Sequence, residues 1–340
     1  MGLDVLNPVS LKKLKGIGGF TFASDALIDN VNFWRAGLLG DATGGGLWTR
    51  LTDPPSSRVH FGMDIVGDDI YFLGSYGAGG VGMSPTKYNV TTNSYTILPQ
   101  SGTIPSSRDQ FASGISNGFF YVFGGAATNQ SYKYQLSTGI WTSLAPMPIS
   151  QDCSGCFGNN GLFYTHGGST EGVPLSQNNS LLMYNPSSNV WTTLAAHGPA
   201  LEQSEMTAIG DCVYTVGGVT SDGGGNVTYY SINDRYNYTI PEWEVMYTLP
   251  SPRNDHFITV RNGEIWCIGG HGYGANYTDI VRYNPSTNLW ITDPTPAPVA
   301  FALGRCVTHG VTGDIYVNSN GQMWKYSSTA VSKFAVERFY

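Results

Sequence analysis

The sequence predicts an all-β protein in which one repeat of about 50 residues occurs six times. An aliphatic and aromatic run recurs at nearly even spacing, from IYFLG at 70–74 to IYVNS at 315–319. The aromatic second residue of this run falls at positions 71, 121, 164, 214, 266 and 316. Charged residues form only 12% of the chain, and 44 glycines and 21 tyrosines are present, as in turn-rich β proteins. Self-similarity at such a period is typical of propellers and solenoids.

The elements within each repeat predict one small antiparallel sheet. The apolar run predicts a strand that is buried on both faces, because apolar and polar residues do not alternate in it. Most runs end in a double glycine such as Gly124-Gly125, where the chain takes a positive φ or passes close to another backbone. A pair of turn residues such as Asn117-Gly118 precedes each run and predicts a tight hairpin from the innermost strand to the second.

A tyrosine followed seven residues later by an aromatic residue marks the third and fourth strands. The pairs are Tyr88 and Tyr95, Tyr134 and Trp141, Tyr184 and Trp191, Tyr236 and Trp243, and Tyr283 and Trp290. We expect these rings to form core between neighbouring sheets. The period, the double glycine and the spaced aromatic pair resemble the kelch repeat over roughly residues 47–330. The resemblance implies a six-bladed β-propeller with four-stranded blades.

The closure of the ring is predicted from an unmatched motif near the N-terminus. The sixth repeat has Tyr326, but Lys333 stands seven residues later where an aromatic residue is expected. GLWTRL at 46–51 resembles the fourth-strand sequence GIWTSL at 139–144 and has no repeat upstream of it. We therefore expect Trp48 to supply the outer strand of the last blade, which hides two sheet edges. The predicted domains are an arm at 1–45, the propeller at 46–330 and a tail at 331–340.

The arm contains several large apolar residues, among them Phe20, Phe22, Phe33 and Trp34. Two interpretations are open. The arm covers a face of its own propeller, or it docks onto a partner subunit. We expect docking, through these four residues, because the propeller closes without them.

Candidate binding residues lie at the starts of the predicted inner strands, in SRVHF (57–61), SRDQF (107–111), PRNDHF (252–257) and GRCVTH (304–309). In kelch propellers these starts face the mouth of the central channel, where family members bind peptides or other ligands. The resemblance assigns to this mouth Arg58, His60, Arg108, Gln110, Asp152, Glu205, Arg253, Asp255 and Arg305. Arginine suits the forked recognition of carboxylates. Alternatively, the arginines bind groups of neighbouring blades and only cement the ring.

Several classes of partner and chemistry are disfavoured by the composition. A net charge of −7 and a pI near 5.3 argue against nucleic acid, which needs a basic field. No run of 18 apolar residues predicts a membrane span, and no signal peptide is apparent, so we expect a cytoplasmic protein, or a virion protein if the source is viral. Cys153 and Cys156 have metal-type spacing, but residues three apart on a strand point to opposite faces. No metal or other cofactor is expected.

The function expected from these features is a non-enzymatic interaction or structural module. A charge-poor surface without an export signal favours a subunit of a larger assembly, such as the tail, neck or head decoration of a phage or virus particle, with host or glycan recognition as one use. The alternatives are a kelch substrate adaptor that presents a peptide, or a carbohydrate-acting propeller enzyme that resembles sialate mutarotases or galactose oxidase. No catalytic motif stands out, and perturbed acids in a channel pocket would favour the enzyme.

Overall fold

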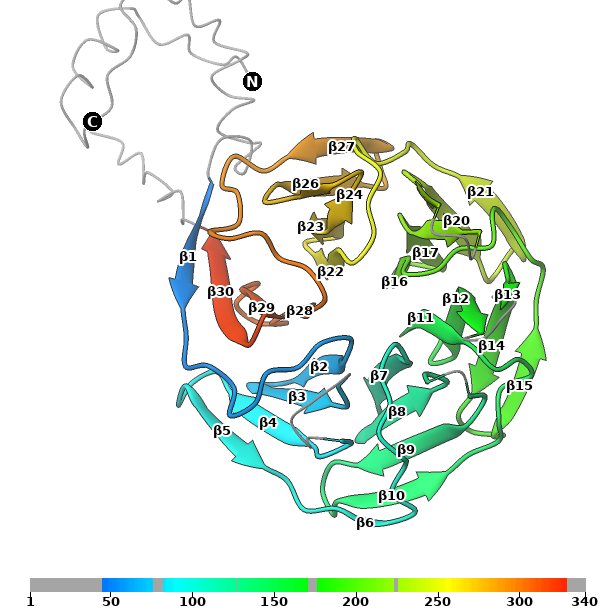
Figure 1. Ribbon diagram of the computed structural model, residues 1–340, viewed down its shortest axis with the longest axis vertical. Helices are drawn as coiled ribbons and strands as arrows, with labels where there is room; N and C mark the ends of the chain where they lie inside the picture. Colours follow the sequence, from blue (N-terminus) through cyan, green and yellow to red (C-terminus); the bar gives the residue numbers. More distant parts are fainter. Residues whose placement is uncertain (1–44, 76–81, 127, 171–175, 223–225, 329–340) are drawn as a thin grey trace, which may run out of the picture. The chain divides into compact units, whose positions relative to one another are not determined.

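The computed structural model describes residues 45–75, 82–126, 128–170, 176–222 and 226–328. Six of the sheets that these residues form have four antiparallel strands at their centre and are arranged as blades around one axis (Figure 1). Over the same residues the chain has no helix, and therefore none that is long and apolar enough to cross a membrane. The predicted all-β, six-bladed propeller is confirmed.

The first three blades follow one another along the chain, and each runs from the axis to the rim. Blade one consists of β2 (Gly62–Val66), β3 (Asp69–Leu73), β4 (Thr86–Asn89) and β5 (Ser94–Ile97). Blade two consists of β7 (Ala112–Ser116), β8 (Phe119–Phe123), β9 (Ser131–Gln135) and β10 (Ile140–Ser143), with β6 (Ser101–Gly102) at its edge. Blade three consists of β11 (Asp152–Phe157), β12 (Phe163–Thr170), β14 (Leu181–Asn185) and β15 (Val190–Thr193), and β13 (Ser176–Gln177) pairs with β12.

The last three blades repeat this order. Blade four consists of β16 (Glu205–Ile209), β17 (Cys212–Val216), β20 (Asn233–Asn237) and β21 (Glu242–Val245). Blade five consists of β22 (Phe257–Arg261), β23 (Glu264–Ile268), β26 (Ile280–Asn284) and β27 (Leu289–Thr292). Blade six consists of β28 (Arg305–Thr308), β29 (Ile315–Ser319), β30 (Gln322–Ser328) and β1 (Gly46–Arg50). Each innermost strand contacts the next one around the ring, including β28 and β2.

The turn residues take the conformations that the sequence predicts. Asn117 and Gly118 both have positive φ, at 49° and 78°, and join β7 to β8 as a two-residue hairpin. Gly124 and Gly125 also have positive φ. A Cβ on Gly125 would lie 2.4 Å from the carbonyl oxygen of Asp109, so the close approach of two backbones also requires glycine here.

The spaced aromatic residues lie opposite one another on the third and fourth strands of each blade. Tyr134 is paired with Trp141 in the register of β9 and β10, and their ring centroids are 5.1 Å apart. In the last blade Tyr326 on β30 is paired with Trp48 on β1, with ring centroids 5.2 Å apart. The strand that carries Trp48 therefore completes blade six, as predicted.

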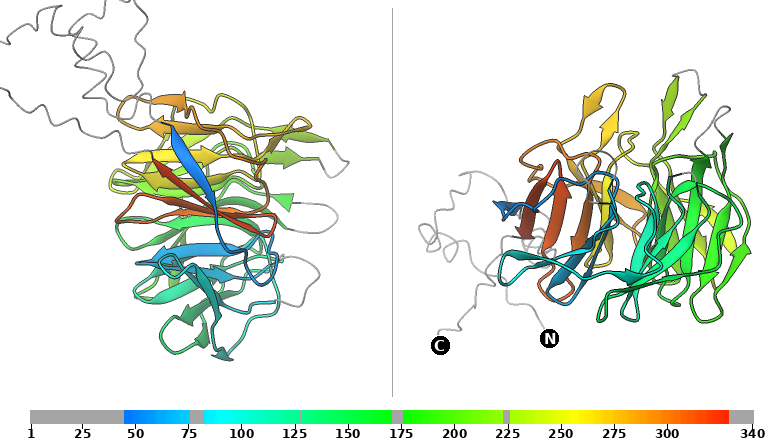
Figure 2. Two further views of the ribbon diagram at one scale, coloured as in Figure 1. Left: turned by 90° about the vertical axis from the view of Figure 1, so that its left-hand side faces the viewer. Right: turned by 60° about the horizontal axis from the view of Figure 1, so that its bottom comes forward.

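Two hairpins add to the basic blade pattern. Blade four carries β18 (Val219–Ser221) and β19 (Val227–Tyr229), and blade five carries β24 (His271–Gly272) and β25 (Ala275–Asn276). Both project beyond the blades on the same side of the propeller (Figure 2, right). The sequence repeat does not reveal them, because their residues lie between the second and third strands and leave the period nearly unchanged.

Candidate functional site

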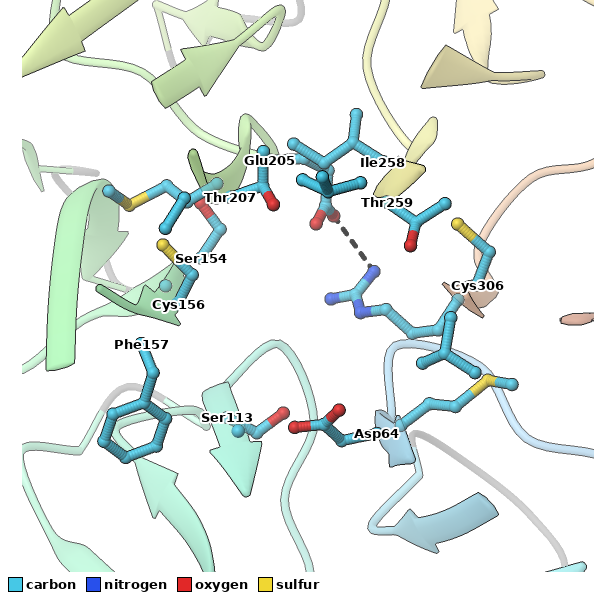
Figure 3. A pocket seen from close by; sticks show the side chains of 18 of the residues that line it. Asp64, Ser113, Ser154, Cys156, Phe157, Glu205, Thr207, Ile258, Thr259 and Cys306 are labelled. Carbon is cyan, nitrogen blue, oxygen red and sulfur yellow. Dashed lines mark hydrogen bonds and ion pairs between the residues drawn. The ribbon is translucent and has the colours of Figure 1, made fainter. Parts of the chain in front are cut away.

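The innermost strands of all six blades surround a cavity of about 340 Å³ on the axis. Hydroxyl and carboxyl groups face it, including those of Asp64, Ser113, Thr207 and Thr259 (Figure 3). A smaller recess lies at the end of the axis where the inner strands start. We call this recess the mouth. The mouth and the cavity share Ser154, Glu205 and Arg305, so the two spaces meet at these residues.

The mouth is built on residues in a left-handed backbone conformation. His60, Gln110, Gln203 and Asp255 each stand two residues before an inner strand, line the mouth, and have φ between 50° and 53°. Leu303 occupies the same position in blade six with φ 59°. A residue other than glycine in this region costs about 1 kcal/mol, and such strain is found mainly at functional sites. The same conformational strain therefore occurs at the same position in five blades.

Hydrogen bonds link these left-handed residues from blade to blade. The backbone N–H of His60 donates to the Leu303 carbonyl at 3.1 Å, and that of Gln110 donates to the His60 carbonyl at 3.1 Å. Gln110 Nε2 lies 3.1 Å from His60 Nδ1, and His60 Nε2 lies 3.5 Å from Asp255 Oδ1. Asn254 Nδ2 donates to Gln203 Oε1 at 2.5 Å. Asn254 Nδ2 also donates to Asp255 Oδ2 at 3.1 Å, so these contacts connect His60, Gln110, Gln203 and Asp255.

An ion pair crosses the channel where the mouth meets the cavity. Arg305 Nη1 on blade six lies 3.0 Å from Glu205 Oε1 on blade four, and the dashed line in Figure 3 marks this contact. Blade five lies between these two blades in the ring. Burial raises the pKa of Glu205, and the nearby Arg305 acts in the opposite direction. The pair therefore forms a polar boundary between the mouth and the cavity.

Asp64 is a second carboxyl group on the cavity wall. Its Oδ1 accepts a hydrogen bond from the backbone N–H of Ile65 at 2.8 Å, and its Oδ2 accepts one from the N–H of Ile115 on blade two at 2.6 Å. Burial nevertheless raises the pKa of Asp64 to about 6, because the N–H donors offset only part of the desolvation. Asp64 is therefore a carboxyl group that changes charge near neutral pH.

The raised pKa of Asp64 makes stability depend on pH. Between about pH 4 and 6 the folded chain retains a proton that the unfolded chain releases, so this carboxyl group stabilises the fold increasingly as the pH falls from 7 to 4. We expect the wild type to gain about 1–3 kcal/mol of unfolding free energy over an Asp64→Asn variant across this interval. Urea denaturation of both proteins at each pH measures it. An equal difference at pH 7 and pH 4 would contradict the expected titration.

Six of the nine predicted mouth residues line the mouth in the structure. They are His60, Gln110, Asp152, Glu205, Asp255 and Arg305. Five further residues line the mouth that the sequence did not predict there, namely Ser154, Ser169, Glu202, Gln203 and Ser204. Gln203 could have been predicted from the sequence, because it stands two residues before its inner strand, as His60 and Gln110 do.

The other three predicted residues, Arg58, Arg108 and Arg253, are corrected by the structure. Their side chains are at most 2% exposed and lie inside their own blades. Each donates through Nη1 to the carbonyl of the glycine that follows the second strand, over distances of 2.6, 3.2 and 3.0 Å. Arg253 also forms an ion pair with Asp279 at 2.9 Å. These arginines therefore have the structural role that the sequence left open as the alternative, but their partners lie in their own blades and not in neighbouring ones.

This correction reverses the charge expected at the mouth. With the three arginines inside the blades, the mouth has one guanidinium, that of Arg305, and the carboxyl groups of Asp152, Glu202, Glu205 and Asp255. A recess rich in carboxylates attracts cations, whereas a ring of arginines would attract carboxylates. Within the described part of the chain, no group of three or more His, Cys, Asp or Glu residues is placed to hold a metal ion.

The predicted docking residues Phe20, Phe22, Phe33 and Trp34 lie outside the described residues, as do most of the predicted arm and tail. Docking through residues 1–45 stays a prediction.

Comparison with known proteins identifies a family. The family model of the KLHDC2/KLHL20/DRC7 Kelch-repeats domain matches residues 127–318. The chain is 25% identical over 277 residues to Kelch-like protein terF of Aspergillus terreus, an alignment that covers 75% of this chain and 59% of that protein. It is 23% identical over 278 residues to Kelch-like protein 15 of Homo sapiens, covering 74% of this chain and 45% of that protein.

The chain thus spans about half the length of the curated relatives it matches. A solved structure titled "Structure of YjhT" aligns with a TM-score of 0.64 and 18% identity, over 82% of this chain and 95% of that one. At this identity the similarity concerns the fold alone. The family model matches more than half of the sequence and the structure has the corresponding six blades, so the chain belongs to the kelch-repeat family.

Proposed function

We propose that this propeller is a protein-interaction module whose mouth binds a cationic segment of a partner protein. The observation that carries the proposal is the composition of the mouth, which has four carboxyl groups and one guanidinium. The side chains of Glu205 and Asp255 are only 15% exposed, so a cation bound beside them would be weakly screened by solvent. The family is consistent with this use, since kelch propellers bind other proteins.

The mouth also retains hydrogen-bonding capacity for a ligand. Ser154 Oγ and Asn254 Oδ1 are buried and have no hydrogen-bond partner within the described part of the protein. Buried polar atoms without partners are costly, so a bound segment that supplies a donor to each gains affinity. Ser154 lines the mouth directly, and Asn254 is adjacent to Asp255 in the sequence.

The substitution Asp255→Asn tests the proposal without disturbing the backbone. Asn tolerates the left-handed conformation of residue 255 at least as well as Asp does, and it removes the charge while its amide oxygen can still accept the hydrogen bond from Asn254 Nδ2. Heptapeptides selected on the wild type from a random display library are expected to be enriched in Lys and Arg over Asp and Glu. Their affinity for the Asp255→Asn variant is expected to fall about tenfold, measured by fluorescence anisotropy.

A matched control is Glu242→Gln, which removes one negative charge from the exposed outer strand β21. It is expected to leave peptide affinity unchanged, which separates a local effect at the mouth from a change in net charge. Selection of acidic peptides, or equal losses in Asp255→Asn and Glu242→Gln, would refute binding of a cationic segment at the mouth.

The setting in which the module works is a further part of the proposal. A charge content of 12% and the apolar residues of the segment 1–45 support a subunit of a larger assembly, such as a phage or virus particle. Membership of the kelch-repeat family supports a substrate adaptor instead. Electron microscopy of material from the native source distinguishes them, because a free cytosolic protein is incompatible with a particle subunit.

A carbohydrate-acting enzyme is the second candidate. It is favoured by one observation, the presence of two carboxyl groups with raised pKa, Asp64 and Glu205, on the wall of one cavity. Interconversion of the anomers of free reducing sugars, followed by proton NMR with and without the protein, tests this candidate. Acceleration that is lost in Glu205→Gln would favour the enzyme over the interaction module.

A further inference from the structure

Aromatic side chains gather on the two projecting hairpins of blades four and five. Tyr229 on β19 contacts Tyr273 at the tip of the other hairpin, with ring centroids 4.9 Å apart and planes at 57°. Tyr229 also lies 5.7 Å from the ring of His271 on β24. We call these three residues the aromatic ledge. The ledge is formed by side chains from two blades, so the two hairpins hold each other in place.

Tyr273 is unusual in both its exposure and its backbone. Its side chain is 66% exposed, and its φ is +41°. It is followed by Gly274 with φ +80°, and the two residues form the loop between β24 and β25, as in a type I′ turn. Asn, Asp or Gly is preferred at the first position of this turn, and a bulky ring there is strained. A strained, exposed aromatic residue points to selection for contact with a ligand.

The ledge adjoins the acidic mouth through backbone pairing. Glu202 of the mouth is paired with Val219 of β18, and Asn254, next to Asp255, exchanges two hydrogen bonds of 2.9 Å with His271. Tyr273 is two residues beyond His271, which corresponds to about 7 Å along a strand. A peptide that occupies the mouth therefore reaches the ledge within two or three of its own residues.

The carboxylates of the mouth and the aromatic rings of the ledge together indicate which side chain would bind there. A guanidinium stacks on aromatic faces and forms forked hydrogen bonds with carboxylates, whereas the compact, strongly hydrated ammonium of lysine does so less well. Blade five contains such an arrangement within the protein, since the Arg253 guanidinium lies 4.4 Å from the Tyr277 ring centroid and pairs with Asp279. A partner arginine on the ledge would reproduce it with Tyr273 and the mouth carboxylates.

We propose that the aromatic ledge is a subsite for an arginine side chain of the partner segment, next to the cation held in the mouth. This proposal rests on the proposed function, because it specifies one side chain of the cationic segment that the mouth binds. It predicts that the protein prefers arginine to lysine at one position of the bound peptide.

Tyr273→Asn is the variant that tests the ledge. Asn suits the left-handed position, so the melting temperature is expected to stay equal or rise, which excludes unfolding as a cause of lost binding. The affinity of a selected arginine peptide is expected to fall about three- to tenfold, and that of its lysine counterpart to stay unchanged. Tyr247→Asn is the matched control, because Tyr247 is 58% exposed and stands two residues after the outer strand β21.

A second measurement keeps the ledge testable if no peptide binds the mouth. Tyrosine rings labelled with carbon-13 are followed by NMR while Nα-acetyl-arginine amide or Nα-acetyl-lysine amide is added. Movement of the Tyr273 resonance with the arginine compound alone supports the ledge even where the proposed function has failed. No movement, equal movement with both compounds, or a larger response to methyl galactoside, which would indicate a glycan subsite, overturns the proposal.

Discussion

Replacing Arg253 by methionine is expected to lower the free energy of unfolding by about 3–4 kcal/mol. The guanidinium is fully buried, donates to the Gly269 carbonyl at 3.0 Å, and forms two hydrogen bonds of 2.9 and 3.0 Å with Asp279. Methionine fills much of the same volume but has no donor. The buried Gly269 carbonyl would therefore lose a partner that water cannot replace fully inside the blade, and the Asp279 carboxylate, which is 34% exposed, would lose its ion pair. Urea denaturation followed by tryptophan fluorescence measures the loss.

The matched control for this variant is Arg235→Met. Arg235 pairs with Glu244 at 2.6 Å, but both side chains are partly exposed, so the expected cost is below about 1 kcal/mol. At a temperature where both variants are folded, the Arg253→Met variant is expected to bind a selected peptide as the wild type does, because Arg253 does not line the mouth. Equal stability losses in the two variants would contradict the cementing role, and a loss of peptide binding would return Arg253 to the site.

The fold could be predicted from the sequence because its signals are local. A hairpin pair such as Asn117-Gly118, the double glycine and the aromatic pair each fix a few residues, and the period places them in successive blades. The closure of the ring could be predicted for the same reason. The sequence around Trp48 resembles a fourth strand, and the sixth repeat, which contains Tyr326, has no fourth strand of its own. These inferences needed no knowledge of contacts between distant residues.

The directions of side chains at the mouth could not be predicted in the same way. Arg58 and His60 are two residues apart in one motif, yet the arginine points into the blade and the histidine lines the mouth. The difference arises from the left-handed conformation of His60, and nothing in the residue type requires that conformation. The sequence therefore assigned Arg58 to the mouth together with His60, although only His60 lines it.

Contacts across the channel depend on the geometry of the whole ring. Glu205 and Arg305 are 100 residues apart, and both stand at the first position of an inner strand. The repeat could assign them to equivalent positions in blades four and six. Only the diameter of the closed ring decides that their side chains meet, and that diameter follows from packing between blades, which the repeat does not encode.

Closure of the ring leads to the second large effect, which is expected for Trp48→Ala. The Trp48 ring packs edge-on against Phe301 and Tyr326, with centroids 5.4 and 5.2 Å away. Truncation leaves a cavity at the junction between the two ends of the propeller, and it weakens the only strand that covers the outer edge of β30 in the described structure. Because Trp48 is half-buried, we expect a loss of about 2–4 kcal/mol rather than the full cost of a core tryptophan.

Leu47→Ala is the control on the same strand, because Leu47 is 63% exposed and its loss is expected to change stability by less than about 0.5 kcal/mol. Hydrogen exchange locates the effect. In Trp48→Ala the amides of β30 that bond to β1 are expected to exchange faster than those of β9, its counterpart in blade two, since opening of β1 exposes an unpaired edge. If β30 and β9 are affected equally, β1 does not act as the closing strand but only adds to a uniformly stable ring.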